Sequence, residues 1–469
     1  MSGLPSDQKS WTAAQTISAV AGGEISAEAV ATHALQTVDK LDPQINAFTD
    51  VTADRALSEA RAVDEAIARG EELPLAGVPY AVKNLFDMEG VTTRAGSKIN
   101  RENPPAPADS TLVAKLKGAG AILIGGLNMG EYAYDFTGEN VHDGNCLNPH
   151  DLTRMTGGSS SGSGAAAAAG MVPVTLGSDT NGSIRVPSSF CGLFGLKPTY
   201  GRLSRAGSFP FVGSLDHLGP LARSAEDLAL VFDVMQGPDP KDPAQADKPV
   251  LPTMPELSKG IDGLKVAVAG GYFRQKAMPE AFQALDLIAS ALGAIGEIEV
   301  PEAARARAAA YVITTVEGSS LHLDRIRTRP EDFDPDTRDR FISGTMVPAV
   351  WVQQSQRFRS WFRAMMRELF THVDILLAPA TPFHALPSGT KTIVLDGEEM
   401  PARPNIGIFT QPISFIGLPV ATVPVWLDGA SLPIGVQVIA PPWREDLALR
   451  VAHHLQTTGI ASAPVANIQ

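Results

Sequence analysis

Cysteine and charged side chains are scarce in this chain of 469 residues, and each shortage excludes a class of protein. The chain has two cysteines, Cys146 and Cys191, too few for a disulfide framework or a four-cysteine metal site. No uncharged apolar run reaches the roughly 18 residues that a membrane span needs, and the start of the chain lacks the hydrophobic core of a secretory signal. We therefore expect a cytoplasmic protein with reduced thiols.

Basic residues are in the minority. Lys and Arg number 38 against 51 Asp and Glu, which gives a formal net charge of −13. An acidic chain repels nucleic acids and anionic lipids, so neither is expected as the main partner. Hydrophobic residues make up 44% of the chain, enough to exclude general disorder and to supply a large core.

The pattern of apolar residues alternates between strand and helix periods, which predicts an α/β fold. We expect one domain over residues 1–469, with a helical segment over about 1–70 that includes a helix ended by Asp42-Pro43. Six prolines within 237–260 indicate a domain linker or a long surface crossing, and we favour a crossing inside the domain. Strands are expected at 78–86, 121–127, 172–176, 264–269, 373–378, 420–425 and 435–439, and helices at 27–41, 53–69, 111–117, 279–292 and 347–370.

A serine- and glycine-rich loop is expected at 157–164 (GGSSSGSG). A flexible linker would not lead straight into the alanines of 165–169. A phosphate-binding loop would need Gly-Lys-Ser/Thr at its end, which is missing. The segment also matches the G-x-S-x-G elbow of α/β-hydrolases, but 149–156 before it is too polar for the buried strand that such an elbow follows. A second glycine loop is expected at 177–182.

Together these segments resemble the amidase signature family. The resemblance covers nearly the whole chain and implies an α/β/α fold around a large, mixed, twisted sheet, with amide hydrolysis that uses neither cofactor nor metal. A histidine base is disfavoured because His142 and His150, the histidines near the serine loops, have no role in the family. The matching segments are 77–84 (GVPYAVKN), 157–160 (GGSS), 177–187 (GSDTNGSIRVP), 191–192 (CG), 195–199 (GLKPT), 377–382 (LAPATP) and 433–437 (PIGVQ).

The resemblance assigns a Ser-Ser-Lys triad residue by residue. Ser183 matches the family's acylated nucleophile, Ser159 its bridging serine on a cis peptide, and Lys83 its general base. A serine hydroxyl is a weak nucleophile until a nearby base takes its proton. Because burial in an apolar strand favours the neutral amine, Lys83 is suited to that task.

The residues around the nucleophile are expected to bind the oxyanion and to support the loops. The family usually has glycine where this chain has Asn181. The Asn181 side chain is expected either to hold the loop or to point into the acyl pocket, where its amide would contact the substrate. Backbone N–H groups of Thr180, Asn181, Gly182 and Ser183 are expected to face the developing oxyanion. Ser160, Asp179 and Arg185 are expected to support the loops rather than to react.

Other segments indicate the substrate. Within the family, 138–142 and 333–340 are most similar to members that hydrolyse a urea-type amide bearing a carboxylate, with a small partner subunit like the amidotransferase C subunit. The alternatives are the glutaminase subunit of the glutamyl-tRNA amidotransferase and another small-molecule amidase. A non-catalytic scaffold is disfavoured because the triad residues are present, and association of two copies is left open.

In that glutaminase an arginine binds the substrate carboxylate and an aspartate binds its ammonium. The arginine position aligns with Arg340, or with Arg338, whereas the aspartate position falls on Gly407. Tyr311 matches a tyrosine of the substrate pocket. A substrate with a carboxylate and no ammonium fits this change, since a guanidinium binds a carboxylate well. The alternative for Arg340 is a surface ion pair with Asp336 or Asp339.

Overall fold

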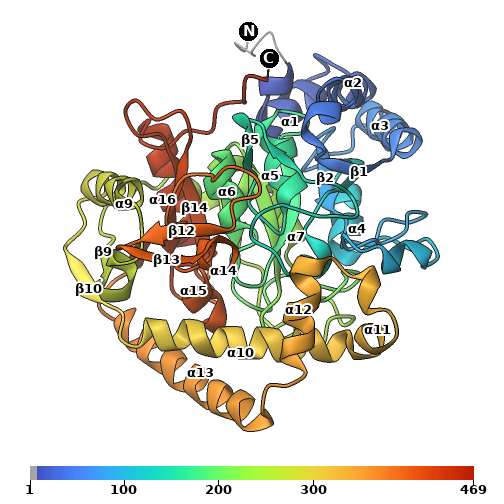
Figure 1. The fold of residues 1–469 in the computed structure, drawn as a ribbon. Helices are drawn as coiled ribbons and strands as arrows, with labels where there is room; N and C mark the ends of the chain where they lie inside the picture. Colours follow the sequence, from blue (N-terminus) through green and yellow to red (C-terminus); the bar gives the residue numbers. More distant parts are fainter. Residues whose placement is uncertain (1–7, 469) are drawn as a thin grey trace.

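A mixed sheet of 11 strands forms the centre of the computed structural model, which describes residues 8–468 (Figure 1). The strand order is β1-β3-β2-β6-β8-β7-β14-β15-β11-β9-β10. Parallel pairs join β3, β2 and β6, and also β11, β9 and β10, while the central strands pair antiparallel. In sheet order the strands span Phe48–Val51, Ile122–Leu127, Pro79–Lys83, Val174–Asp179, His217–Ala222, Phe194–Lys197, Val420–Val425, Ile434–Ile439, Ile375–Pro379, Val266–Gly270 and Glu297–Glu299.

Helices cover both faces of this sheet. The short helices α5 and α6 pack together on one face, where Leu221 of β8 contacts their small side chains. On the other face α7 packs against α4 and α16, and Leu218 and Ala222 of β8 join that larger core. Helix layers around a mixed sheet confirm the predicted fold. The helices are α4 (Thr111–Gly118), α5 (Ser161–Ala168), α6 (Arg185–Cys191), α7 (Ala225–Met235), α9 (Pro279–Ala291, on β11 and β15) and α16 (Glu445–Thr457).

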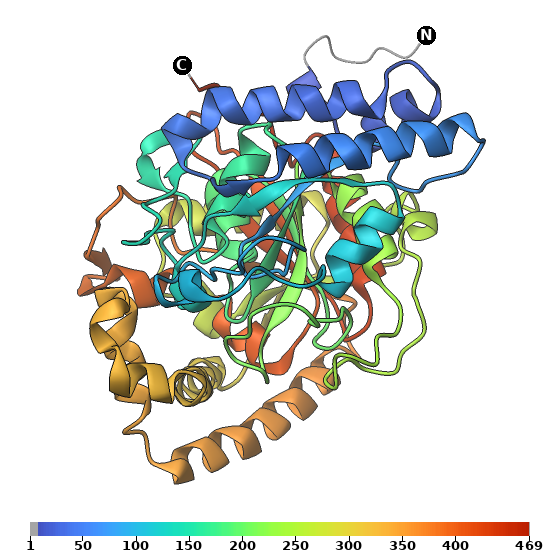
Figure 2. The ribbon, with the colours of Figure 1, turned by 90° about the vertical axis from the view of Figure 1, so that its right-hand side faces the viewer.

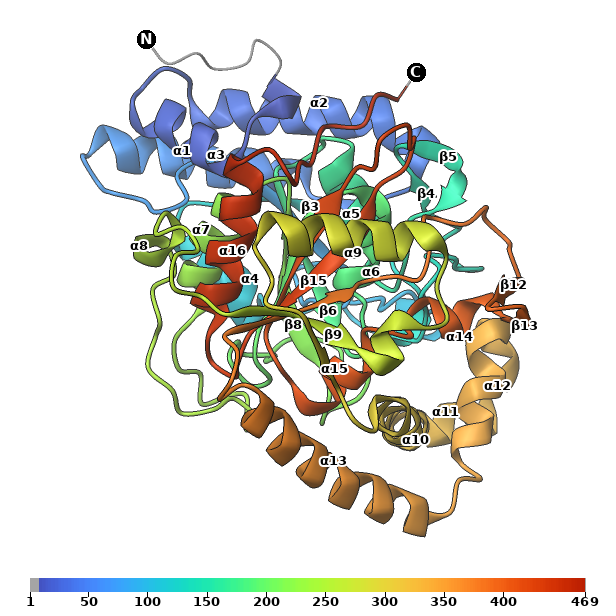
Figure 3. The same cartoon turned by 90° about the vertical axis from the view of Figure 1, so that its left-hand side faces the viewer.

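Two further groups of helices lie at opposite ends of the molecule (Figures 1, 2 and 3). The N-terminal group, α1 to α3, lies beside β1 and β3, whereas α10 packs against α12, α13 and α15 at the other end. The expected helical segment over about 1–70 thus holds α1 to α3 together with β1, and its residues 1–7 lie outside the described part. The bounds are α1 (Ala13–Ala21), α2 (Ala27–Ile45), α3 (Ala53–Ala68), α10 (Ala303–Leu321), α11 (Leu323–Thr328), α12 (Pro335–Gly344), α13 (Ala349–Leu369) and α15 (Gln411–Ile416).

The smaller elements connect these layers. The proline-rich segment 237–260 runs between α7 and β9 and contains one short helix, α8. Its assignment to a crossing inside a single domain stays a prediction. In the part of the chain that the structure describes, no helix has the length and apolar character to cross a membrane. The remaining elements are β4 (Leu147–Asn148), β5 (Asp151–Met155), α8 (Met254–Leu257), β12 (Thr392–Leu395), β13 (Glu398–Pro401), α14 (Ala402–Ile406) and the short 3₁₀ helices Gln8–Ser10, Ile99–Glu102, Glu131–Ala133, Gly271–Arg274 and Pro330–Asp332.

Several predicted boundaries are wrong for local reasons. Helix α2 does not end at Asp42-Pro43 but continues to Ile45, although Pro43 has no N–H to donate to the preceding turn. Asn46 ends the helix in a left-handed conformation, with its N–H bonded to the Asp42 carbonyl oxygen. The loop expected at 157–164 is half helix, because α5 already begins at Ser161. Gly162 lies so close to the backbone at Ala47 that a Cβ would meet its carbonyl oxygen at 2.3 Å. The loop expected at 177–182 begins later, since β6 extends to Asp179.

Candidate active site

Two parallel neighbours, β2 and β6, place Lys83 beside the serine loops. Every residue of both strands is buried, and Val82 is registered with Leu176. Since the carboxyl ends of parallel strands meet at one edge of a sheet, the last residue of β2 lies next to the end of β6. Lys83 Nζ therefore donates to Ser178 Oγ at 2.8 Å. Ser178 lies within a segment that matches the family, but no role was predicted for it.

Lys83 Nζ also donates to Ser159 Oγ at 2.7 Å. Ser159 follows the cis peptide Gly158–Ser159 and precedes α5. Burial lowers the pKa of Lys83 to about 7, because desolvation disfavours the ammonium form more than the nearby carboxylates of Asp216, Asp179 and Asp135 favour it. A lysine with this pKa can accept and return a proton near neutral pH.

Ser160 joins the two serine segments. Its hydroxyl donates to the carbonyl oxygen of Ser178 at 3.2 Å and accepts from the N–H of Ser178 at 3.3 Å. All of these atoms are buried. Ser160 thus links the start of α5 to the end of β6. The supporting role expected of it stays a prediction.

Asp179 and Arg185 form a buried ion pair beneath the second loop. The guanidinium donates to both carboxylate oxygens at 2.9 Å, and it also donates to the carbonyl oxygen of Thr410 and the side chain of Gln437. Arg185 holds the pKa of Asp179 well below its usual range against desolvation. One carboxylate oxygen further accepts from the N–H of Ile184 at 3.2 Å, so the pair fixes the curve of the chain through Ser183.

The loop that connects Asp179 to Arg185 requires a glycine at 182. Its φ is 145°, and a Cβ there would meet Thr410 Oγ1 at 2.3 Å. The Thr410 hydroxyl donates to the carbonyl oxygen of Asn181 at 2.6 Å, while the carbonyl oxygen of Gly182 accepts from the N–H of Val186 at 2.7 Å. Because these contacts engage the carbonyl groups, they set the orientation of the peptides around Ser183.

A pocket opens in front of Ser183 and brings together most of the predicted substrate residues. Asn181, Tyr311 and Arg340 line it with Ser183, although they come from the second loop, α10 and α12. Arg338 is not brought to it, because its guanidinium pairs with Asp339 and Glu331. The other lining residues are Ala133, Tyr134, Asp135, Phe136, Thr180, Phe211, Thr314 and Gln411.

Arg340 is fixed at this pocket by Tyr134. Its guanidinium lies 3.6 Å from the centre of the Tyr134 ring and donates to the Tyr134 carbonyl oxygen at 2.7 Å. The surface ion pair considered for Arg340 is absent among the described residues, since Asp336 pairs with Arg403 and Asp339 with Arg338. A guanidinium that no carboxylate neutralises is available to an anionic ligand.

Gly407, which takes the position of the amidotransferase aspartate, lies against the ring of Phe136. A Cβ at Gly407 would approach that ring to 2.4 Å, so no acidic side chain fits there unless the ring moves. The one carboxylate among the residues that line the pocket, Asp135, is paired with Arg403 at 3.0 Å. The pocket therefore presents one free cation, Arg340, and no free carboxylate among the residues that line it.

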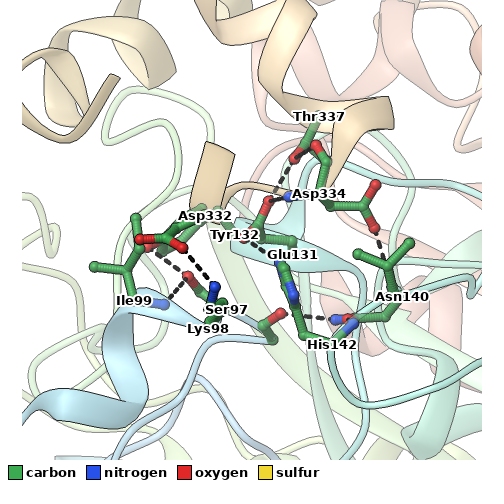
Figure 4. A network of polar contacts seen from close by, with 12 residues as sticks. Ser97, Lys98, Ile99, Glu131, Tyr132, Asn140, His142, Asp332, Asp334 and Thr337 are labelled. Carbon is green, nitrogen blue, oxygen red and sulfur yellow. Dashed lines mark hydrogen bonds and ion pairs between the residues drawn. The ribbon is translucent and has the colours of Figure 1, made fainter. Parts of the chain in front are cut away.

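A buried carboxylate, Glu131, ties α12 to the loop that carries Tyr134 (Figure 4). One oxygen accepts from the N–H of Asp334 at 2.8 Å and from the Thr337 hydroxyl at 2.5 Å, and the other contacts His142 Nε2 at 3.1 Å. Thr337 precedes Arg340 by one helical turn. Glu131 thus fixes the end of α12 that positions Arg340, and no local sequence pattern could have indicated a contact across about 200 residues.

Asp216 is a further site residue that the sequence did not reveal. It is buried below the second loop, where it accepts from the Thr180 hydroxyl at 2.6 Å and from the N–H groups of Phe211 and Val212. Burial raises its pKa above the usual range for aspartate. Its carboxylate is the largest electrostatic influence that raises the pKa of Lys83.

Histidines lie apart from the nucleophile. His142 contacts Glu131, His150 contacts the carbonyl oxygen of Cys191, and no histidine is among the pocket residues. His217 is buried behind the second loop with Nδ1 at 2.9 Å from the Asp179 carbonyl oxygen, and burial lowers its pKa well below the usual range. Within residues 8–468, no three His, Cys, Asp or Glu side chains are grouped to hold a metal ion.

Comparisons with known proteins agree with this geometry. The Amidase family model matches residues 29–449. The chain is 56% identical to the AtzE subunit of 1-carboxybiuret hydrolase from Pseudomonas sp. strain ADP, over 95% of this chain and 98% of that protein. It is 36% identical to the A subunit of the glutamyl-tRNA(Gln) amidotransferase from Koribacter versatilis, over 92% and 95%.

A solved structure shows the same fold. It is described as an unexpected vestigial protein complex that reveals the evolutionary origins of an s-triazine catabolic enzyme. Its TM-score is 0.96 at 56% sequence identity, with 97% of this chain and 100% of that chain covered. The chain belongs to the amidase family and is a hydrolase of amide carbon–nitrogen bonds.

Proposed function

We propose that this amidase hydrolyses the terminal amide of 1-carboxybiuret, giving 1,3-dicarboxyurea and ammonia through an acyl-enzyme on Ser183. The observation that carries the proposal is the pocket in front of Ser183, where Arg340 offers a cation and the ring of Phe136 occupies the space at Gly407. The similarity to 1-carboxybiuret hydrolase supports the same substrate.

The proposed proton relay runs through Lys83, Ser159 and Ser183. Neutral Lys83 takes a proton from the Ser159 hydroxyl as Ser159 takes the proton of Ser183, and Ser183 Oγ forms a bond to the amide carbon. The return of that proton to the nitrogen releases ammonia and leaves the acyl group on Ser183. Water then attacks the ester by the same relay, and the carboxylate product leaves. The contact between Lys83 and Ser159 and the lowered pKa of Lys83 support this sequence.

The developing oxyanion is proposed to accept hydrogen bonds from the backbone N–H groups of residues 180–183. The carbonyl contacts of Asn181 and Gly182, together with the positive φ of Gly182, support this orientation. Loss of one such donor typically costs about 2.7–4 kcal/mol of transition-state stabilisation. Asp179, Arg185 and Ser160 hold the loops that supply these donors.

The substrate is proposed to place its carboxylate against Arg340, with Tyr311 at the mouth of the pocket. Tyr311 is 41% exposed, as expected of a residue at an entrance. Glutamine, the substrate of the main alternative, would bring an ammonium to the region of Gly407, where the pocket offers Phe136 in place of a carboxylate. Arg338 is proposed to have no contact with substrate, since it pairs with Asp339.

The chain is further proposed to act in the cytoplasm with a small partner subunit like the amidotransferase C subunit. Support comes from the structural relative that is described as a protein complex. Measurements of molecular mass in solution test both the partner subunit and the association of two copies of the chain.

Ammonia release tests the proposed function. We expect the enzyme to prefer 1-carboxybiuret over biuret, allophanate and glutamine, both when the chain is assayed alone and when a small subunit is co-expressed with it. Preference for glutamine would assign the chain to the amidotransferase instead. Equal rates on carboxybiuret and biuret would show that the enzyme does not recognise the carboxylate of the substrate.

A further inference from the structure

The oxygen of the Asn181 side-chain amide is buried without a hydrogen-bond partner among the described residues. Asn181 Nδ2 donates to Thr314 Oγ1 on α10 at 2.9 Å, which anchors the side chain across the pocket. Its Oδ1 has no hydrogen-bond partner among the described residues, although the residue is only 7% exposed. Because a buried acceptor that leaves water without a replacement bond is costly, an unpartnered acceptor at a pocket indicates a partner that the chain itself does not supply.

The neighbouring polar groups are already engaged. Gln411 Oε1 accepts from Arg307 Nε at 2.8 Å, and Thr314 Oγ1 holds the Asn181 amide. Arg340 is oriented by the Tyr134 carbonyl oxygen. Asn181 Oδ1 is thus a buried acceptor at the pocket of Ser183 to which no described residue donates, and a bound substrate can supply the donor.

We propose that Asn181 Oδ1 accepts a hydrogen bond from the substrate N–H that adjoins the scissile carbonyl on the side opposite the leaving group. This inference rests on the proposed function and narrows its substrate class to urea-type amides. In an amide of that class the carbonyl has nitrogen on both sides, whereas in glutamine and other alkyl amides a CH₂ takes the inner position. A CH₂ group buries Oδ1 without a donor, so the side chain selects against alkyl amides.

The expected selectivity against alkyl amides can be stated as a ratio of kcat/KM values. A pocket built to hydrogen-bond an N–H discriminates against an analogue that lacks it, because the pocket's own polar atom is then left unpaired. For a single neutral bond the discrimination is expected to be about tenfold to a hundredfold in kcat/KM. The intrinsic reactivity of the two substrate classes differs but does not depend on the enzyme, and the backbone N–H of Asn181 is the same in a side-chain variant. The change in the ratio when the side chain is removed therefore measures the contribution of the side chain.

Biuret and malonamide are the matched probes, since they differ only in N–H against CH₂ at the central position. We expect the wild-type enzyme to have the higher kcat/KM for biuret, and Asn181→Gly to lower the ratio of biuret to malonamide by about tenfold or more. Glycine is tolerated at this position in the commoner family pattern, and circular dichroism checks the fold. Asn181→Asp keeps an acceptor oxygen and is expected to keep the ratio, even where the added charge slows both substrates.

The outcomes separate this inference from the proposed function. A ratio of biuret to malonamide that Asn181→Gly leaves unchanged would overturn the role of Oδ1. A ratio that Asn181→Asp lowers as much as Asn181→Gly would mean that the amide nitrogen, not the oxygen, faces the substrate. Carboxybiuret is assayed in parallel: failure to hydrolyse it, with the biuret ratio intact, would overturn only the proposed substrate.

Discussion

The pKa of Lys83 leads to a quantitative prediction of how activity depends on pH. An ordinary lysine with a pKa of 10.5 would be about 0.03% neutral at pH 7, whereas a pKa of about 7 makes about half of it neutral. Burial in β2 therefore raises the amount of available base about 1,500-fold at this pH. The contacts of Nζ with Ser159 and Ser178 place that base at the serines.

We expect kcat/KM for amide hydrolysis to rise about tenfold between pH 6 and pH 8, because the neutral fraction of Lys83 rises from about 9% to about 91%. The sign follows from the role of the residue as a base, which is active when it is deprotonated. The measurement is ammonia release at substrate concentrations below KM, with the fold checked by circular dichroism at each pH. A rate that keeps rising tenfold per pH unit up to pH 10 would refute the lowered pKa.

Asp216→Asn sharpens this test, since the carboxylate of Asp216 is the largest electrostatic influence that raises the pKa of Lys83. Its removal destabilises the ammonium form, so the midpoint should move below pH 7. Asp242→Asn is the matched control, because Asp242 pairs with Arg205 and is not among the groups that shift the pKa of Lys83. A midpoint that moves upward in Asp216→Asn would contradict the electrostatic account.

The other predictions concern the pocket and its support. Arg340→Ala should raise KM for carboxybiuret by about tenfold to a hundredfold and leave KM for biuret unchanged, and equal effects in the ammonia assay would exclude a carboxylate contact. Glu131→Ala should raise the same KM with little change in kcat for biuret, because the N–H of Asp334 and the hydroxyl of Thr337 lose their acceptor and Arg340 loses its support. An equal fall in kcat for both substrates would indicate a general structural role. Arg185→Met should lower the free energy of unfolding in urea by about 3–5 kcal/mol, because it leaves Asp179 buried without its partner, and a change below 1 kcal/mol would contradict that view of the pair.

Elements with strong local patterns could be predicted from the sequence. β14 occupies the expected 420–425, and α9 ends one residue before the expected 292. The burial of Lys83 also followed from the apolar residues around it in β2. The boundaries that failed lie where tertiary contacts override local signals. α5 starts inside a glycine-rich segment, where the glycine at 162 serves close packing and not a loop conformation, because a Cβ there would meet the backbone of Ala47.

Residues of the site that contact each other across long stretches of sequence were harder to predict. The alignment of Arg340 with the family arginine predicted a residue that does line the pocket. The stacking of Arg340 on Tyr134 could not be predicted, because it depends on how α12 packs. Glu131 and Asp216 were missed because their partners come from elsewhere in the fold, and a lone acidic residue has no local signature. Ser178 lay within a matching segment, yet its contact with Lys83 depends on the register of β2 and β6.

The most direct test of the central claim is ammonia release from 1-carboxybiuret by the wild-type enzyme and by Ser183→Ala. The account predicts rapid release by the wild type and a loss of about four orders of magnitude or more in the variant, because the nucleophile is absent while the pocket is intact. Turnover by Ser183→Ala within about tenfold of the wild-type rate would contradict the assignment of Ser183 as the acylated nucleophile.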